Sequence, residues 1–66
     1  MPFVNIQIVK GQAPAKKDEI AKRVAGAIHD VTGIPKDAVW VVFEDVEATD
    51  WYVGDNSVAA LRKAKS

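Results

Sequence analysis

The stretch PFVNIQIV, residues 2–9, decides the fold of this chain. Its side chains alternate with a period of two, so Val4, Ile6 and Ile8 share one face and the residues between them share the other. Alternation of this kind is typical of a strand that is buried on one side only. The pattern predicts a strand that ends before Gly11.

An amphipathic segment follows at residues 14–32. Its apolar residues recur at helical spacing and form one stripe: Ile20, Val24, Ile28 and Val31. Pro14 suits the first turn of a helix, where its missing N–H costs nothing, and Gly33 suits the position after the last turn. We therefore predict one helix over this segment.

Residues 38–44 are rich in β-forming side chains and predict a second strand. Because the links between strand, helix and strand are short, the chain is expected to form an α/β fold with one right-handed βαβ unit and parallel strands. The whole chain, residues 1–66, is interpreted as a single domain.

The C-terminal third carries weaker signals. Residues 47–50 suggest a turn and 51–53 a short strand, and Gly54, Asp55 and Asn56 suggest a tight turn. Together they predict a small hairpin. Ser57 is expected to cap one or two helical turns through Leu61, which leaves residues 62–66 as a basic tail.

A chain of 66 residues buries little surface on folding. Ordering it costs about 1.5 kcal/mol per residue, or about 100 kcal/mol in total. The sequence has no cysteine and one histidine, which excludes disulfides and a zinc cluster as compensation. With 48% hydrophobic residues and two unpaired strand edges, the chain is predicted to form a homo-oligomer.

Charge and hydropathy exclude several kinds of partner. Nine basic residues balance nine acidic ones, so nothing indicates binding to nucleic acid or to an anionic membrane. No segment has the order of a signal peptide, and no apolar run approaches membrane-spanning length. A cytoplasmic location is expected.

Pro2 is the candidate with catalytic potential. Aminopeptidases remove an initiator methionine before a small residue, so loss of Met1 would leave Pro2 with a free secondary amine. An amine anchored at the start of a strand and partly desolvated can titrate near neutrality and act as base and then as acid. If Met1 stays, the nitrogen is an amide without a basic lone pair. Alternatively, Pro2 merely begins an edge strand.

Taken together, these features resemble the 4-oxalocrotonate tautomerase family over nearly the whole chain. The matching features are Pro2 after Met1, the strand end at residues 9–11, Lys17 early in the helix, and residues 33–35, 39–42 and 50–54. The resemblance implies a hexamer or related assembly of βαβ subunits without a cofactor. It also implies a catalytic amino-terminal proline, matched by Pro2, and an aromatic pocket residue, matched by Trp51.

Two positions depart from the family pattern. Where its well-studied members have arginines that bind substrate carboxylate and polarise the carbonyl, this chain has Gln12 and Trp40. A carboxamide is neutral and an indole offers a single donor, so neither supplies a positive charge. Asp55 also replaces a second hairpin glycine. Dicarboxylates are therefore disfavoured as substrates.

The remaining polar and aromatic candidates have structural alternatives. Phe3, Trp40 and Trp51 are expected to form an apolar wall around the amine or to pack in core and interfaces. Gln12 could donate a hydrogen bond to substrate or be solvated. Lys10 and Lys17 could act as surrogate cations for substrate, or they are solvated on the surface, where His29 is also expected. Glu44 and Asp45 are assigned to opposite faces of the second strand, which argues against paired-carboxylate catalysis.

Pro2 and Gln12 bracket a strand of about eight to ten residues, which places them on the order of 30 Å apart in one chain. A site that uses both must be shared between subunits, for example through antiparallel pairing of two first strands. We interpret the sequence as a tautomerase acting on a small enol or 2-keto acid, with Pro2 as base and Gln12, Trp40 and Trp51 as substrate-binding residues. The alternatives are a proline-dependent hydratase, dehalogenase or decarboxylase, or an inactive structural or binding paralogue.

Overall fold

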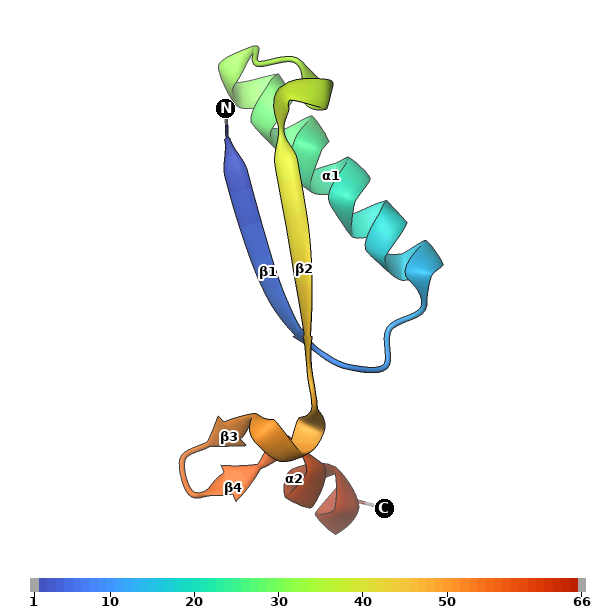
Figure 1. Ribbon diagram of the computed structural model, residues 1–66, viewed down its shortest axis with the longest axis vertical. Coiled ribbons are helices and arrows are strands. Elements are labelled where there is room, and N and C mark those ends of the chain that lie inside the picture. The colour runs from blue at the N-terminus through green and yellow to red at the C-terminus, as the bar shows by residue number, and fades with distance from the viewer. Residues whose placement is uncertain (1, 66) are drawn as a thin grey trace.

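The computed structural model describes residues 2–65 and has one long helix, two long strands and a small C-terminal unit (Figure 1). Strand β1 spans Phe3–Val9, helix α1 Pro14–Thr32 and strand β2 Trp40–Val46. The C-terminal unit contains strands β3 (Tyr52–Val53) and β4 (Asn56–Ser57) and helix α2 (Val58–Lys65). Single 3₁₀ turns at Lys36–Ala38 and Ala48–Asp50 flank β2.

The predicted βαβ unit is confirmed. Strands β1 and β2 pair in parallel, from Phe3 opposite Trp40 to Val9 opposite Val46. The alternation in β1 has the predicted faces, because Val4, Ile6 and Ile8 are half-buried while Phe3, Asn5 and Gln7 are exposed. One face of the sheet therefore packs inward and the other is open.

Helix α1 has the predicted bounds. Gly33 ends it with a positive φ of 79°, and its N–H donates to the carbonyl of His29 at 2.8 Å. The apolar stripe is half-buried except for Val31, which is 85% exposed. Val31 continues the stripe by its helical spacing, but the sheet does not cover it. A helix of 19 residues is about 28 Å long whereas seven-residue strands are about 23 Å, so the last turn extends past the sheet.

The second strand lies two residues later than predicted. Residues 36–38 form a 3₁₀ turn, closed by a 3.1 Å hydrogen bond from the Val39 N–H to the Lys36 carbonyl. At the other end the strand continues to Val46, because the Lys10 N–H donates to the Val46 carbonyl at 2.8 Å. Pairing with β1 thus overrides the low strand propensity of the two acidic residues at 44 and 45.

The predicted hairpin is present, with β3 antiparallel to β4 and Gly54 at φ 65° in the turn. Ser57 caps the final helix as predicted, since its Oγ accepts a 3.1 Å hydrogen bond from the Ala60 N–H. The expectation of a basic tail at residues 62–66 is wrong for residues 62–65, which are helical. Strong helix formers after the cap account for this extension. Residue 66 lies outside the described residues.

A single chain is elongated rather than compact. Its radius of gyration is 15.2 Å, whereas a compact chain of this length has about 11 Å. None of the side chains of residues 2–64 is fully buried. In the described part of the chain, no helix is both long enough and apolar enough to cross a membrane.

Candidate active site

Pro2 is held firmly against the sheet. Its carbonyl accepts a 2.9 Å hydrogen bond from the Trp40 N–H, which extends the β1–β2 ladder to the second residue of the chain. Pro2 is half-buried. The backbone of Pro2 therefore has a defined place at the end of the sheet.

Two aromatic side chains lie beside Pro2. Phe3 and Trp40 are opposite each other in the parallel register, so their side chains share the open face of the sheet. They remain 60% and 54% exposed in one chain. This pair supplies exposed apolar surface on the open face of the sheet, at the strand end where Pro2 lies.

The other two predicted site residues lie elsewhere. Gln12 is exposed in the loop after β1, and Trp51 is half-buried at the start of the hairpin, where its carbonyl accepts from the Val58 N–H at 2.7 Å. The amino terminus lies at one end of the molecule and the hairpin at the other (Figure 1). One chain thus brings Trp40 to Pro2 but leaves Gln12 and Trp51 at the far end.

Lys10 and Lys17 each bind a carboxylate. The Lys10 ammonium lies 3.0 Å from the Glu47 carboxylate, and this hydrogen bond raises the pKa of Lys10. The Lys17 ammonium lies 2.8 Å from the Asp45 carboxylate. Both lysines therefore have a structural role at the C-terminal ends of the strands, beyond the solvated role expected from the sequence.

Lys16, which was not a candidate from the sequence, lies beside Gln12. Lys16 and Gln12 share a groove on the β1 side of α1, lined also by Ile8, Glu19, Ile20 and Arg23. Arg23 is bound to Glu19 at 2.9 Å, whereas no ion pair of Lys16 is found among residues 2–65. The sequence shows two adjacent lysines, and only the fold distinguishes Lys16, beside the groove, from Lys17, which is bound to Asp45.

The acidic pair at 44 and 45 points to opposite faces, as predicted. On the open face, Glu44 accepts hydrogen bonds from the Asn5 and Gln7 amides at 3.1 and 3.2 Å, while Asp45 binds Lys17 toward the helix. His29 is exposed, and its Nδ1 lies 2.9 Å from the Ile34 carbonyl oxygen. Within residues 2–65, no three acidic or histidine side chains gather into a potential metal site.

A sequence profile for the tautomerase enzyme family matches residues 2–61. The fold is similar to the crystal structure of TomN, a 4-oxalocrotonate tautomerase homologue in the tomaymycin biosynthetic pathway. The TM-score is 0.92 at 29% sequence identity, covering 98% of this chain and all of TomN. The chain belongs to the 4-oxalocrotonate tautomerase family. Membership in this family supports tautomerase activity.

Two further relatives of this tautomerase-family chain are informative. A probable tautomerase of Xylella fastidiosa is 39% identical over 51 residues, which are 77% of this chain but only 62% of that protein. The chain therefore spans less than two thirds of the Xylella relative. A heterohexameric 4-oxalocrotonate tautomerase of Chloroflexus aurantiacus has a TM-score of 0.86 at 29% identity, covering 94% of this chain and all of that one.

Proposed function

We propose that this chain is a tautomerase that interconverts the enol and keto forms of a small 2-keto acid, with Pro2 as the base. The observation that carries the proposal is the 2.9 Å hydrogen bond from Trp40 to the Pro2 carbonyl, which fixes the residue next to two exposed aromatic rings. Removal of Met1 is required, because only then does Pro2 carry an amine. Residues 2–66 then act as one tautomerase domain.

The proposed reaction needs one proton carrier. The neutral Pro2 amine takes the hydroxyl proton of the enol, and the oxygen electron pair forms the carbonyl. The former C=C electrons then take a proton at carbon from the protonated amine, so the base is restored. An amine can serve both steps only if its pKa lies near the working pH, and partial desolvation by Phe3 and Trp40 favours this.

Gln12 and Trp51 complete the site only from neighbouring subunits. If two β1 strands pair antiparallel, the Pro2 end of one strand meets the Gln12 end of the other. Pro2 and Gln12 then lie close together although they are far apart within one chain. Lys16 accompanies Gln12 and supplies one positive charge for a substrate carboxylate. This arrangement favours a monocarboxylate enol over a dicarboxylate.

Oligomerisation follows from the same geometry. The elongated chain has unpaired strand edges and large exposed apolar side chains, and a structural relative is a heterohexamer. We infer a homo-oligomer, a hexamer or trimer of dimers, in which core and site are completed together.

The test is turnover of phenylenolpyruvate by the processed protein and by Pro2→Ala. The variant keeps a primary amine but loses the secondary one, so kcat/KM should fall on the order of 10² or more, the range of general-base catalysis. Sedimentation should remain unchanged. Equal turnover by the two proteins would exclude Pro2 as the base and would favour another activity or a binding role.

A further inference from the structure

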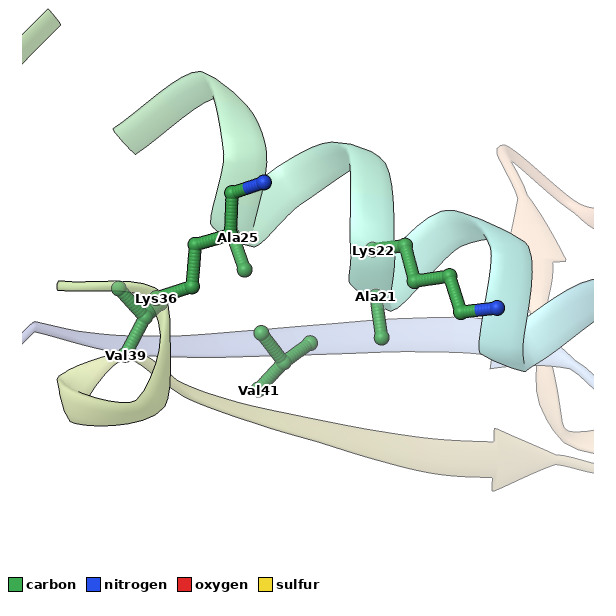
Figure 2. Close-up of a pocket in the computed structure, with 6 residues that line it drawn as sticks. All are labelled: Ala21, Lys22, Ala25, Lys36, Val39 and Val41. Carbon is green, nitrogen blue, oxygen red and sulfur yellow. The ribbon is translucent and has the colours of Figure 1, made fainter. Parts of the chain in front are cut away.

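Helix α1 faces β2 with side chains that are spaced four residues apart. Figure 2 shows Ala21 and Ala25 pointing from α1 toward the side of the sheet where Val41 lies. Lys17 precedes Ala21 by four residues, so it lies on the same face of the helix, about one turn nearer the helix start. At this end the contact with β2 is ionic instead of apolar, because the Lys17 ammonium lies 2.8 Å from the Asp45 carboxylate.

The Lys17–Asp45 ion pair is partly sheltered from water. The two side chains are 26% and 40% exposed, whereas those of the Lys10–Glu47 pair are 62% and 58% exposed. Salt and water screen an ion pair less when its groups are partly covered. The sheltered pair therefore ties the first turn of α1 to the C-terminal end of β2.

The loop between β1 and α1, residues 10–13, is anchored at both ends. At its first residue, the Lys10 N–H donates to the Val46 carbonyl at 2.8 Å. At its last residue, the Ala13 carbonyl accepts a hydrogen bond from the Lys17 N–H at 3.3 Å. Because the side chain of Lys17 is bound to β2, the ion pair connects the second anchor to the same strand that holds the first.

Gln12 lies on the short arc between these anchors. Gly11 and Gln12 are the two residues that separate Lys10 from Ala13. Gly11 has a φ of 131°, a value that residues with a side chain rarely adopt, so the course of the arc is specific. An arc of two residues cannot absorb a shift of the helix start relative to β2. Such a shift would therefore move Gln12.

We propose that the Lys17–Asp45 ion pair is a positioning device for Gln12, which it holds in the orientation that meets the substrate in the active site of a neighbouring copy. Neither member of the pair contacts the substrate. The inference rests on the proposed function in one respect, because it places Gln12 in that site. A group that is already held in place loses little freedom when the substrate binds, so its hydrogen bond contributes more to binding.

The mobility of the loop tests this device without any substrate. Asp45→Asn removes the charge and keeps the shape of the side chain, and sedimentation should show an unchanged assembly. The ¹⁵N order parameters of the Gly11 and Gln12 amides should be about 0.85 in the native protein and should fall toward about 0.6 in the variant. Lys17→Met should have the same effect.

Two further variants serve as controls for the mobility measurement. Lys17→Arg keeps the positive charge and should leave the order parameters unchanged. Asp30→Asn, an exposed change elsewhere on α1, should also leave them unchanged. If the order parameters of Gly11 and Gln12 stayed at the native values in both Asp45→Asn and Lys17→Met, the proposal would be overturned.

Turnover of phenylenolpyruvate gives a second readout, which separates positioning from a general effect on stability. Asp45→Asn should raise KM about threefold to tenfold, the loss expected for one neutral hydrogen bond, while kcat stays within a factor of about two. In a Gln12→Ala background the same change should have no further effect on KM, because the ion pair acts through Gln12. An equal rise of KM in both backgrounds would overturn the proposal.

A failure of the proposed function gives a different result. If Gln12→Ala leaves KM unchanged while Asp45→Asn still lowers the order parameters, the ion pair does position Gln12. That outcome would contradict only the place of Gln12 in the neighbour's site.

Discussion

The Trp40 N–H donates to the Pro2 carbonyl at 2.9 Å, and this bond extends the parallel ladder to the second residue of the chain. Termini usually fray, and their amines then sit in bulk water. Here the backbone of Pro2 is fixed relative to the indole of Trp40 and the ring of Phe3. A fixed position beside apolar surface is what an amine needs in order to act as a general base in a defined direction.

Assembly and folding should be inseparable in this protein. No side chain of residues 2–64 is fully buried in one chain, so the protein is expected to sediment as a species larger than a dimer. Increasing denaturant should abolish the helical circular dichroism signal and the tautomerase activity over the same range of denaturant concentration, and the unfolding midpoint should rise with protein concentration. Dilution should abolish both together. A folded and active monomer at low concentration would contradict this expectation.

The substrate preference should follow from the charge available in the site. A charge-assisted hydrogen bond is worth about 1.5–3 kcal/mol, or about one to two decades in binding. Because Gln12 is neutral, 2-hydroxymuconate should be handled poorly relative to phenylenolpyruvate. Gln12→Arg should improve the dicarboxylate selectively, mainly through a lower KM, as measured by kcat/KM for both substrates.

Lys16→Ala tests whether Lys16 supplies the positive charge that binds the substrate carboxylate. Because Lys16 is proposed to bind the single carboxylate of phenylenolpyruvate, Lys16→Ala should lower kcat/KM for this substrate by about one to two decades. An unchanged kcat/KM would exclude Lys16 from substrate binding. Asp30→Ala, an exposed change elsewhere on α1, is the control for this assay.

Glu47→Gln should destabilise the protein in a pH-dependent way. Glu47 raises the pKa of Lys10, so the pair contributes stability that is fully present below the ordinary lysine value of 10.5 and is lost as pH rises through the higher folded-state pKa. The difference in urea midpoint between wild type and variant should therefore be present at pH 8 and shrink above pH 10.5. Glu19→Gln is the control. A difference that persists unchanged at high pH would show that Glu47 acts by packing.

Much of the fold is predictable from local patterns. The alternation of residues 2–9 and the caps of α1 are strong signals, and both elements have nearly the predicted bounds. The start of β2 is less predictable. Lys36–Ala38 form a 3₁₀ turn, and strand propensity carries no information about the local hydrogen bonds of such a turn. For α2, Ser57 and the alanines that follow were a usable signal, but the lysines and arginine after them suggested a solvated tail instead.

The candidate site is predictable only in part. Pro2 is evident from its position, and its neighbour Trp40 follows from the parallel register. The contributions of Gln12 and Trp51 depend on how copies of the chain pack, and no periodicity within 66 residues specifies that packing. Lys16 became a candidate only when the fold placed it in the groove beside Gln12.

The most direct test of the central claim compares two forms of the same chain that differ only in Met1. Intact mass identifies the processed form, and an engineered form that retains Met1 carries an amide at the nitrogen of Pro2. If Pro2 is the base, the processed form should ketonise phenylenolpyruvate, with kcat/KM rising through the pKa of one amine. The form that retains Met1 should be slower by a factor on the order of 10² or more. Equal kcat/KM for the two forms, with the same assembly mass, would contradict the role of Pro2 as the base.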